Sequence, residues 1–111
     1  MIMMLAALSA AIAIGAGAFG AHGAPSVQAA DWLRTGGLYQ LVHAVAVIAL
    51  ASMPGSRAPL WVILSGSLLF AVTLYAMAFG APRWFGAITP IGGVLMILGW
   101  LWVAVRFSGR V

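Results

Sequence analysis

Apolar residues fill this sequence in four long runs, which a few charged residues separate. The uncharged stretches are 1–30, 35–56, 58–82 and 84–105. Each contains the roughly 20 apolar residues that a helix needs to cross a hydrocarbon core about 30 Å thick. Because backbone polar groups must be paired inside lipid, each stretch is predicted to be a helix. The pattern therefore predicts an all-α integral membrane protein, a four-helix bundle that forms a single transmembrane domain over residues 1–111.

Turn residues set the limits of the predicted spans. Pro54 and Pro59 bracket one tight turn, and Gly80–Arg83 forms the next, since proline and glycine interrupt helices. The resulting spans are about 2–21, 37–53, 60–79 and 85–107. We expect the first span to be retained rather than cleaved, because no Lys or Arg precedes its apolar run as a signal peptide requires.

A polar segment joins the first two spans and predicts one further element. Ser26 is a good helix N-cap, and Asp31 and Arg34 would share one helical face. The pair Gly36–Gly37 can then end the helix. The prediction is a short amphipathic helix at about 26–35 that lies in the membrane interface. The alternative function for this segment is a lid over the neighbouring histidine region.

Composition supports a membrane location and excludes several functions. The chain has 111 residues, of which 65% are hydrophobic and 5% charged, whereas soluble domains have about 25% charged residues. It has no cysteine, which excludes disulfides and thiolate chemistry. The net charge of +4 comes from scattered arginines, and a nucleic-acid interface would need them clustered on one face. The expected partner is the lipid bilayer, and nucleic acid is not expected.

The arginines also predict an orientation. With four spans, both termini share one side of the membrane. Arg57, Arg106 and Arg110 lie on that side, while Arg34 and Arg83 lie on the other. Because positive residues accumulate in cytoplasmic loops, we expect both termini to be cytoplasmic.

Four motifs, taken in order, resemble a known family. They are GAFGAHG at 17–23, WLRTGGLYQLVHA at 32–44, GSLLF at 66–70 and TPIGG at 89–93. On these motifs the chain is similar, over essentially its whole length, to the small inner-membrane proteins of the YgdD type (domain-of-unknown-function family 423, UPF0382-like). Members often have several lysines after the first motif, where this chain has Ala24–Ser26. The resemblance implies a four-helix protein of the bacterial inner (plasma) membrane and supplies no activity, cofactor or catalytic residue.

Four polar side chains form the candidate site. His43 lies roughly two turns inside the predicted second span, where polar residues are costly and usually face the bundle interior. Tyr39 and Gln40 share its helical face at i−4 and i−3, and His22 ends the first span on the same membrane side. We interpret these residues as a polar cluster that binds a lipid, a small apolar ligand or a membrane partner. The structural alternative is that His43 fixes helix packing through a hydrogen bond.

Neither a metal nor a cofactor is predicted. The chain has two histidines and one acidic residue, and a zinc site needs three or four ligands. The different depths of the two histidines oppose bis-histidine haem. There is no Ser–His–carboxylate set and no carboxylate pair, so we expect a protein that is not an enzyme. General acid–base chemistry by His43 and Tyr39 is the remaining enzymatic alternative.

Transport and self-association are the other hypotheses. A small oligomeric transporter or proton-coupled channel would use His43 as a titrating group, since histidine exchanges protons near neutral pH. The lack of an Asp or Glu inside the spans opposes it. The partners left open are a second copy of the chain and another membrane protein.

Small residues are predicted to form the helix contacts. Rows of small side chains four positions apart let membrane helices approach closely. The residues assigned to packing are Gly15, Gly17, Gly20, Ser67, Gly92 and Gly93.

Overall fold

The computed structural model describes residues 1–109 and is entirely helical over that range. Its long helices are α1 (Ile2–His22), α2 (Val27–Leu50), α3 (Arg57–Ala78) and α4 (Thr89–Arg106), and a short 3-10 helix, η1 (Arg83–Ala87), leads into α4. By length and composition, all four long helices could cross a membrane, the last together with η1. This confirms the predicted all-α chain with four helices of membrane-spanning length. Arg110, which entered the orientation count, lies outside the described residues.

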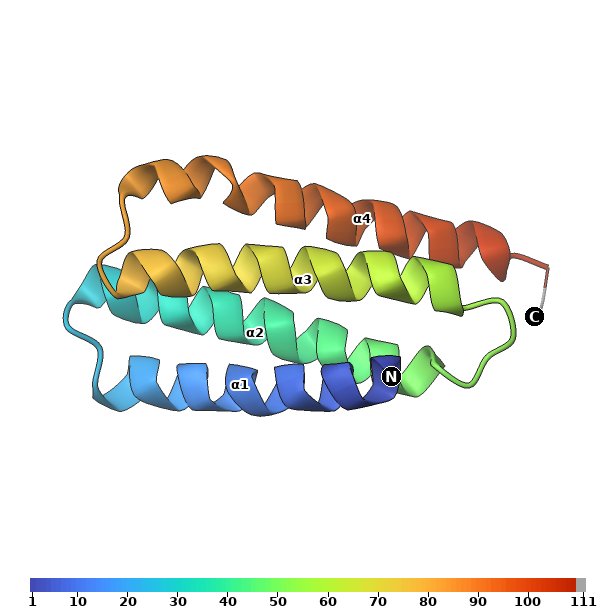
Figure 1. Cartoon of the computed structure of the whole chain (residues 1–111), viewed down its shortest axis with the longest axis horizontal. Helices are drawn as coiled ribbons and strands as arrows, with labels where there is room; N and C mark the ends of the chain where they lie inside the picture. The colour runs from blue at the N-terminus through green and yellow to red at the C-terminus, as the bar shows by residue number, and fades with distance from the viewer. Residues whose placement is uncertain (110–111) are drawn as a thin grey trace.

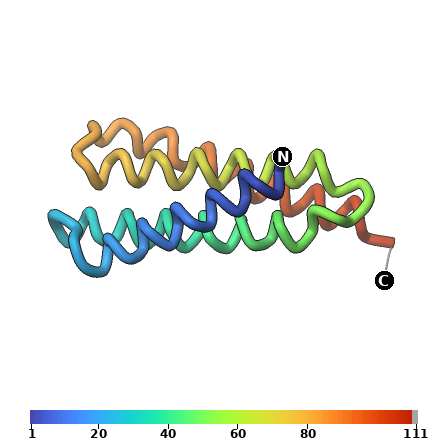
Figure 2. Tube along the Cα trace, turned by 60° about the horizontal axis from the view of Figure 1, so that its bottom comes forward, coloured from blue at the N-terminus to red at the C-terminus, as the bar shows by residue number. Residues whose placement is uncertain are grey.

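The helices pack in the order in which they occur along the chain. α1 packs along α2, α2 along α3 and α3 along α4, while α1 touches α3 only briefly. Figure 1 shows Met1 and the end of α4 at the same end of the bundle. Figure 2 shows the α1–α2 and α3–α4 hairpins apart at the end of the α1–α2 connection, with α1 and α4 running obliquely towards the other end. Within residues 1–109, no Cα atom of α2 lies within 8 Å of one in α4, so only side chains fill the space between these two helices.

The predicted interfacial helix at 26–35 is wrong as a separate element. Ser26 does cap a helix, because its hydroxyl accepts a hydrogen bond from the Ala29 backbone nitrogen at 3.0 Å. That helix is α2, which continues without interruption from Val27 to Leu50. The second helix of spanning length therefore begins ten residues before the predicted start of that span at 37.

The glycine pair inside α2 explains why the helix continues. A Cβ atom placed on Gly37 would lie 3.1 Å from the Ala13 oxygen in α1. One placed on Gly36 would lie 2.8 Å from Cε1 of Tyr75 in α3. Neither glycine has a positive φ, the conformation that commonly ends a helix. The two glycines allow close contact on two sides of α2.

The six residues assigned to packing differ in how closely they approach a neighbouring helix. Gly92 lies where the backbones of α4 and α3 approach closely: a Cβ atom there would be 2.5 Å from the Phe70 nitrogen. Ser67 is fully buried in α3. In α1, a Cβ atom on Gly20 would lie 3.1 Å from Leu33 Cβ of α2, and Gly17 lies beside Gly37. Added Cβ atoms on Gly15 and Gly93 would have more room, with nothing within 4 Å of the first and only Phe70 Cδ1, at 4.0 Å, near the second.

Apolar side chains form two core clusters, one towards each end of the bundle. The cluster near Met1 contains Ile2, Ala6, Val47, Leu60, Ile63 and Leu64, and that near the α1–α2 connection contains Ala29, Leu33 and Ala78. Polar contacts and an open groove lie between them and make up the candidate site.

Candidate functional site

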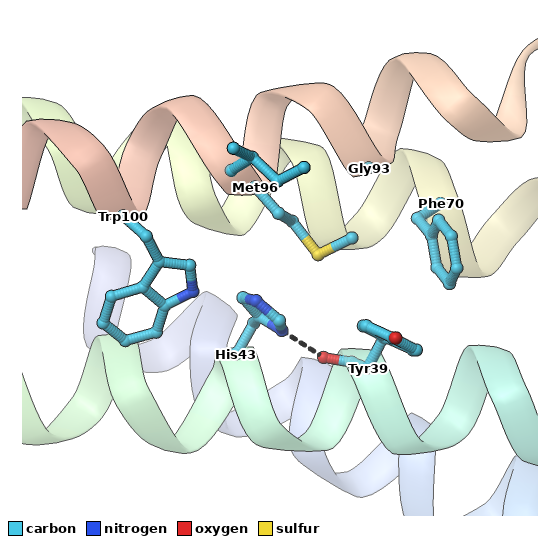
Figure 3. A pocket seen from close by; sticks show the side chains of 7 residues that line it. Tyr39, His43, Phe70, Gly93, Met96 and Trp100 are labelled. Carbon is cyan, nitrogen blue, oxygen red and sulfur yellow. Dashed lines mark hydrogen bonds between the residues drawn. The ribbon is translucent and has the colours of Figure 1, made fainter.

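A groove of about 390 Å³ lies between α2 and α4 (Figure 3). We call it the α2–α4 groove, and its lining residues are Tyr39, His43, Phe70, Gly93, Met96, Ile97 and Trp100. It forms because the backbones of α2 and α4 stay apart and because Gly93 contributes no side chain. Its volume is within the range of small-molecule sites, about 300–1,000 Å³. No charged side chain among the described residues lines it.

His43 is the main polar group of the groove. It is 7% exposed, and its Nδ1 lies 2.7 Å from the Tyr39 carbonyl oxygen one turn earlier in α2 (Figure 3). A carbonyl oxygen only accepts, so Nδ1 carries the hydrogen and donates it. In the neutral ring, Nε2 is then an acceptor. Over residues 1–109, no side chain or backbone group is hydrogen-bonded to Nε2.

Aromatic rings surround the imidazole and fix its orientation. The Tyr39 ring lies roughly parallel to it, with centroids 6.2 Å apart, and also contacts Phe70 at 5.0 Å. Trp100 of α4 meets the imidazole edge-on at 5.9 Å. In Figure 3 the indole nitrogen of Trp100 lies on the side of that ring facing His43. The α2 and α4 walls of the groove therefore meet through His43 and Trp100.

Gln40 belongs to a different site, in the interior of the bundle where α1 and α3 face α2. Its Nε2 donates to Ser9 Oγ of α1 at 2.9 Å. Its Oε1 accepts from the Tyr75 hydroxyl of α3 at 2.5 Å. Gln40 is 1% exposed, so this bridge joins three helices inside the bundle. Sequence analysis did not identify Ser9 or Tyr75, although each is a polar residue inside an apolar span.

His22 lies far from both of these sites. It is exposed at the end of α1, beside a second pocket that Ser26 and Arg34 also line. His43 is sixteen positions beyond Val27, the first residue of α2, so about 24 Å of helix separates it from that end of the bundle. Of the four predicted residues, the structure brings only Tyr39 and His43 into one site.

The continuous α2 also changes the depth of the candidate site. With α2 running from Val27 to Leu50, Tyr39 lies at the middle of the helix and His43 about 7 Å beyond its midpoint, at about 1.5 Å per residue. A core about 30 Å thick would place both residues well inside the hydrocarbon. The groove lies close to the middle of α2 along its length, not at the end that joins α1.

Charged side chains of the described residues lie away from the groove. Arg34 and Asp31 face each other at 3.7 Å on the exposed surface of α2. The Arg83 guanidinium lies 6.0 Å from the centroid of the Trp32 ring. Over residues 1–109, no three His, Cys, Asp or Glu side chains gather closely enough to hold a metal ion.

Together these features define a polytopic helical membrane protein with an uncharged lateral groove. Residues 16–93 match the family model described as "Protein of unknown function (DUF423)". The chain belongs to this family. No solved structure matches it.

Curated relatives cover almost the full length of the chain. A UPF0382 membrane protein of Staphylococcus saprophyticus is 37% identical, over 93% of this chain and 92% of the relative. One of Haemophilus influenzae is 39% identical, over 92% and 89%. The UPF0382 inner membrane protein YgdD of Escherichia coli K12 is 35% identical, over 88% and 82%. Family membership and four helices of membrane-spanning length identify a multi-pass membrane protein of a family with no assigned function, and the Escherichia coli relative is named an inner membrane protein.

Proposed function

We propose that this protein is not an enzyme and binds a lipid or another lipophilic molecule in the α2–α4 groove. One observation supports the proposal above all: His43 Nε2 faces an apolar groove, and no described residue pairs with it. A polar atom in hydrocarbon without a partner costs free energy. A ligand with an apolar body and one polar group would fill the groove and pair with this nitrogen.

The hydrogen bond of His43 argues against a purely structural role. It joins Nδ1 to the Tyr39 carbonyl, within α2 itself. A bond inside one helix does not hold two helices together, whereas the Gln40 bridge to Ser9 and Tyr75 does. Interhelical packing is thus assigned to Gln40, and His43 remains available for a ligand.

A direct test compares lipids that co-purify with wild type and with a filled groove. Gly93→Leu would place a side chain in the groove, where an added Cβ meets only Phe70 Cδ1 at 4.0 Å. Gly15→Leu is the matched control, because an added Cβ at Gly15 has nothing within 4 Å. Mass spectrometry should find a lipophile enriched in wild type and Gly15→Leu and lost from Gly93→Leu. The same lipids in all three preparations would refute binding at the groove.

Transport through the bundle is the competing function, and it needs a continuous polar path. Ser9, Gln40 and Tyr75 form a bridge across three helices. In this bridge the amide nitrogen and the amide oxygen of Gln40 are each hydrogen-bonded. That arrangement favours a static support. A liposome flux assay that compares wild type with His43→Ala decides the question. Proton or solute flux that depends on His43 would show that the protein transports, and the binding proposal would be abandoned.

Both termini are proposed to face the cytoplasm, on the basis of the arginines. Arg57 and Arg106 lie at the end of the bundle that holds Met1, and Arg83 lies at the opposite end. Because the chain has no cysteine, single substitutions give a clean labelling test. On intact cells, an impermeant maleimide should label Pro82→Cys and leave Ser108→Cys unlabelled until the membrane is opened. The reverse labelling pattern would show that both termini face the outside.

A further inference from the structure

Two nitrogen atoms of opposite hydrogen-bonding character lie near each other in the α2–α4 groove. His43 Nε2 is an acceptor, because Nδ1 donates to the Tyr39 carbonyl. The indole nitrogen of Trp100 is a donor only. The two rings meet edge-on at 5.9 Å between centroids, and Figure 3 shows the indole nitrogen on the side facing His43. Within residues 1–109, neither nitrogen is hydrogen-bonded to the other or to a third group.

A hydroxyl group satisfies both nitrogens at once. Its oxygen can accept from the Trp100 N–H while its hydrogen goes to His43 Nε2. An ether or ester oxygen only accepts, so it would leave Nε2 without a donor. An ammonium group only donates, so it would leave the indole N–H without an acceptor. The pair therefore selects for a group that both donates and accepts.

Charge further restricts the ligand. No Lys, Arg, Asp or Glu of the described chain lines the groove, and the Asp31–Arg34 pair is exposed near the start of α2. An anionic carboxylate or phosphate bound here would lose its hydration without gaining an opposite charge, which is costly. A neutral polar group avoids that cost.

Water alone is a poorer occupant than an alcohol. A buried water normally makes about three hydrogen bonds to protein. The side chains of Phe70, Met96 and Ile97, which also line the groove, are apolar. An alcohol would supply the same hydroxyl and also fill the apolar volume.

We infer that the α2–α4 groove binds a neutral lipophilic alcohol or phenol whose hydroxyl bridges His43 Nε2 and Trp100 Nε1. The inference rests on the proposed function and adds the chemical class of the ligand. His43 and Trp100 determine specificity, and the apolar residues hold the chain or ring of the ligand.

Native mass spectrometry of the purified full chain tests the inference with three probes. Dodecanol donates and accepts, its methyl ether only accepts, and dodecanoate is anionic. Wild type should bind dodecanol roughly fivefold or more tightly than the other two, the effect of one neutral hydrogen bond. His43→Phe should bind dodecanol and its ether equally, because the Trp100 N–H can donate to either oxygen. Trp100→Phe should bind both more weakly than wild type and keep the preference for dodecanol, because His43 Nε2 still accepts only from the alcohol.

Matched variants make the comparison specific. His22→Phe and Trp102→Phe change the same residue types outside the groove, and both should keep the wild-type affinity for dodecanol and the preference for it. Equal binding of all three probes by wild type would overturn the hydroxyl inference and leave the binding function in place. Preferential binding of dodecanoate would overturn the inference as well. If wild type binds no probe better than Gly93→Leu does, the proposed function and the inference both fail.

Discussion

Adding one methyl group at Gly92 tests how closely α3 and α4 pack. A Cβ atom there would lie 2.5 Å from the Phe70 nitrogen and 2.6 Å from the Gly66 oxygen. Both neighbours are backbone atoms, so no side chain can rotate away. Gly93, the next residue, would place its Cβ no nearer than 4.0 Å to Phe70 Cδ1. Alanine at either glycine adds the same methyl group. At Gly92 that methyl group meets backbone atoms, and at Gly93 it has room.

The structure gives the size of the effect. Non-bonded atoms settle at about 3.5–4.0 Å, so Gly92→Ala would push α4 away from α3 by roughly 1 Å. A gap of that size forfeits up to about half of each dispersion contact along the interface. Overpacking of this kind costs about 1–3 kcal/mol, and the gain in helix propensity returns about 1 kcal/mol. We expect a net loss of about 1 kcal/mol for Gly92→Ala and no loss for Gly93→Ala.

Reversible unfolding in mixed detergent micelles, followed by circular dichroism, measures this difference. The free energy of unfolding should fall for Gly92→Ala and stay level or rise for Gly93→Ala. A Gly92→Ala protein as stable as wild type would refute the reasoning, because it would mean that α3 and α4 are not in backbone contact at Gly92.

Three further substitutions address the polar contacts, measured by the same unfolding assay. Gln40→Leu should cost about 1–3 kcal/mol, since it leaves the Tyr75 hydroxyl unpaired inside the bundle; no loss would remove the bridge as a structural support. Thr73→Val breaks the 2.7 Å bond to Thr89 between α3 and α4, and we expect about 0.6 kcal/mol; a loss above about 2 kcal/mol would contradict that value. Asp31→Asn removes an exposed pair and should change stability by less than about 0.5 kcal/mol, so a larger change would reveal a missed contact.

Hydropathy was enough to predict four helices, but it misassigned the two glycines of α2. Gly36 and Gly37 follow a polar segment, and such a pair is typical of a helix end. In the fold, Gly37 faces Ala13 of α1 and Gly36 faces Tyr75 of α3. Whether a glycine ends a helix or allows close contact depends on which helices lie beside it. A single sequence contains no interhelical register, so the error could not have been found there.

The same limit applies to the candidate site. Helical spacing placed Tyr39 and His43 on one face of α2, and these two residues do line one groove. The α4 wall, with Trp100, could not be predicted because nothing local to α2 indicates which residue of α4 lies opposite. Spacing also grouped Gln40 with His43, yet Gln40 lies near the edge of that face and hydrogen-bonds to Ser9 of α1 instead.

The helices of this protein pack almost entirely against their neighbours in the chain. As each new helix leaves the ribosome and enters the bilayer, the surface on which it packs is already present. Chains fold from the N-terminus during synthesis, so this arrangement permits stepwise assembly without a helix having to wait for a distant partner. The α2–α4 groove would then be the last feature to form, and only the insertion of α4 would enclose His43.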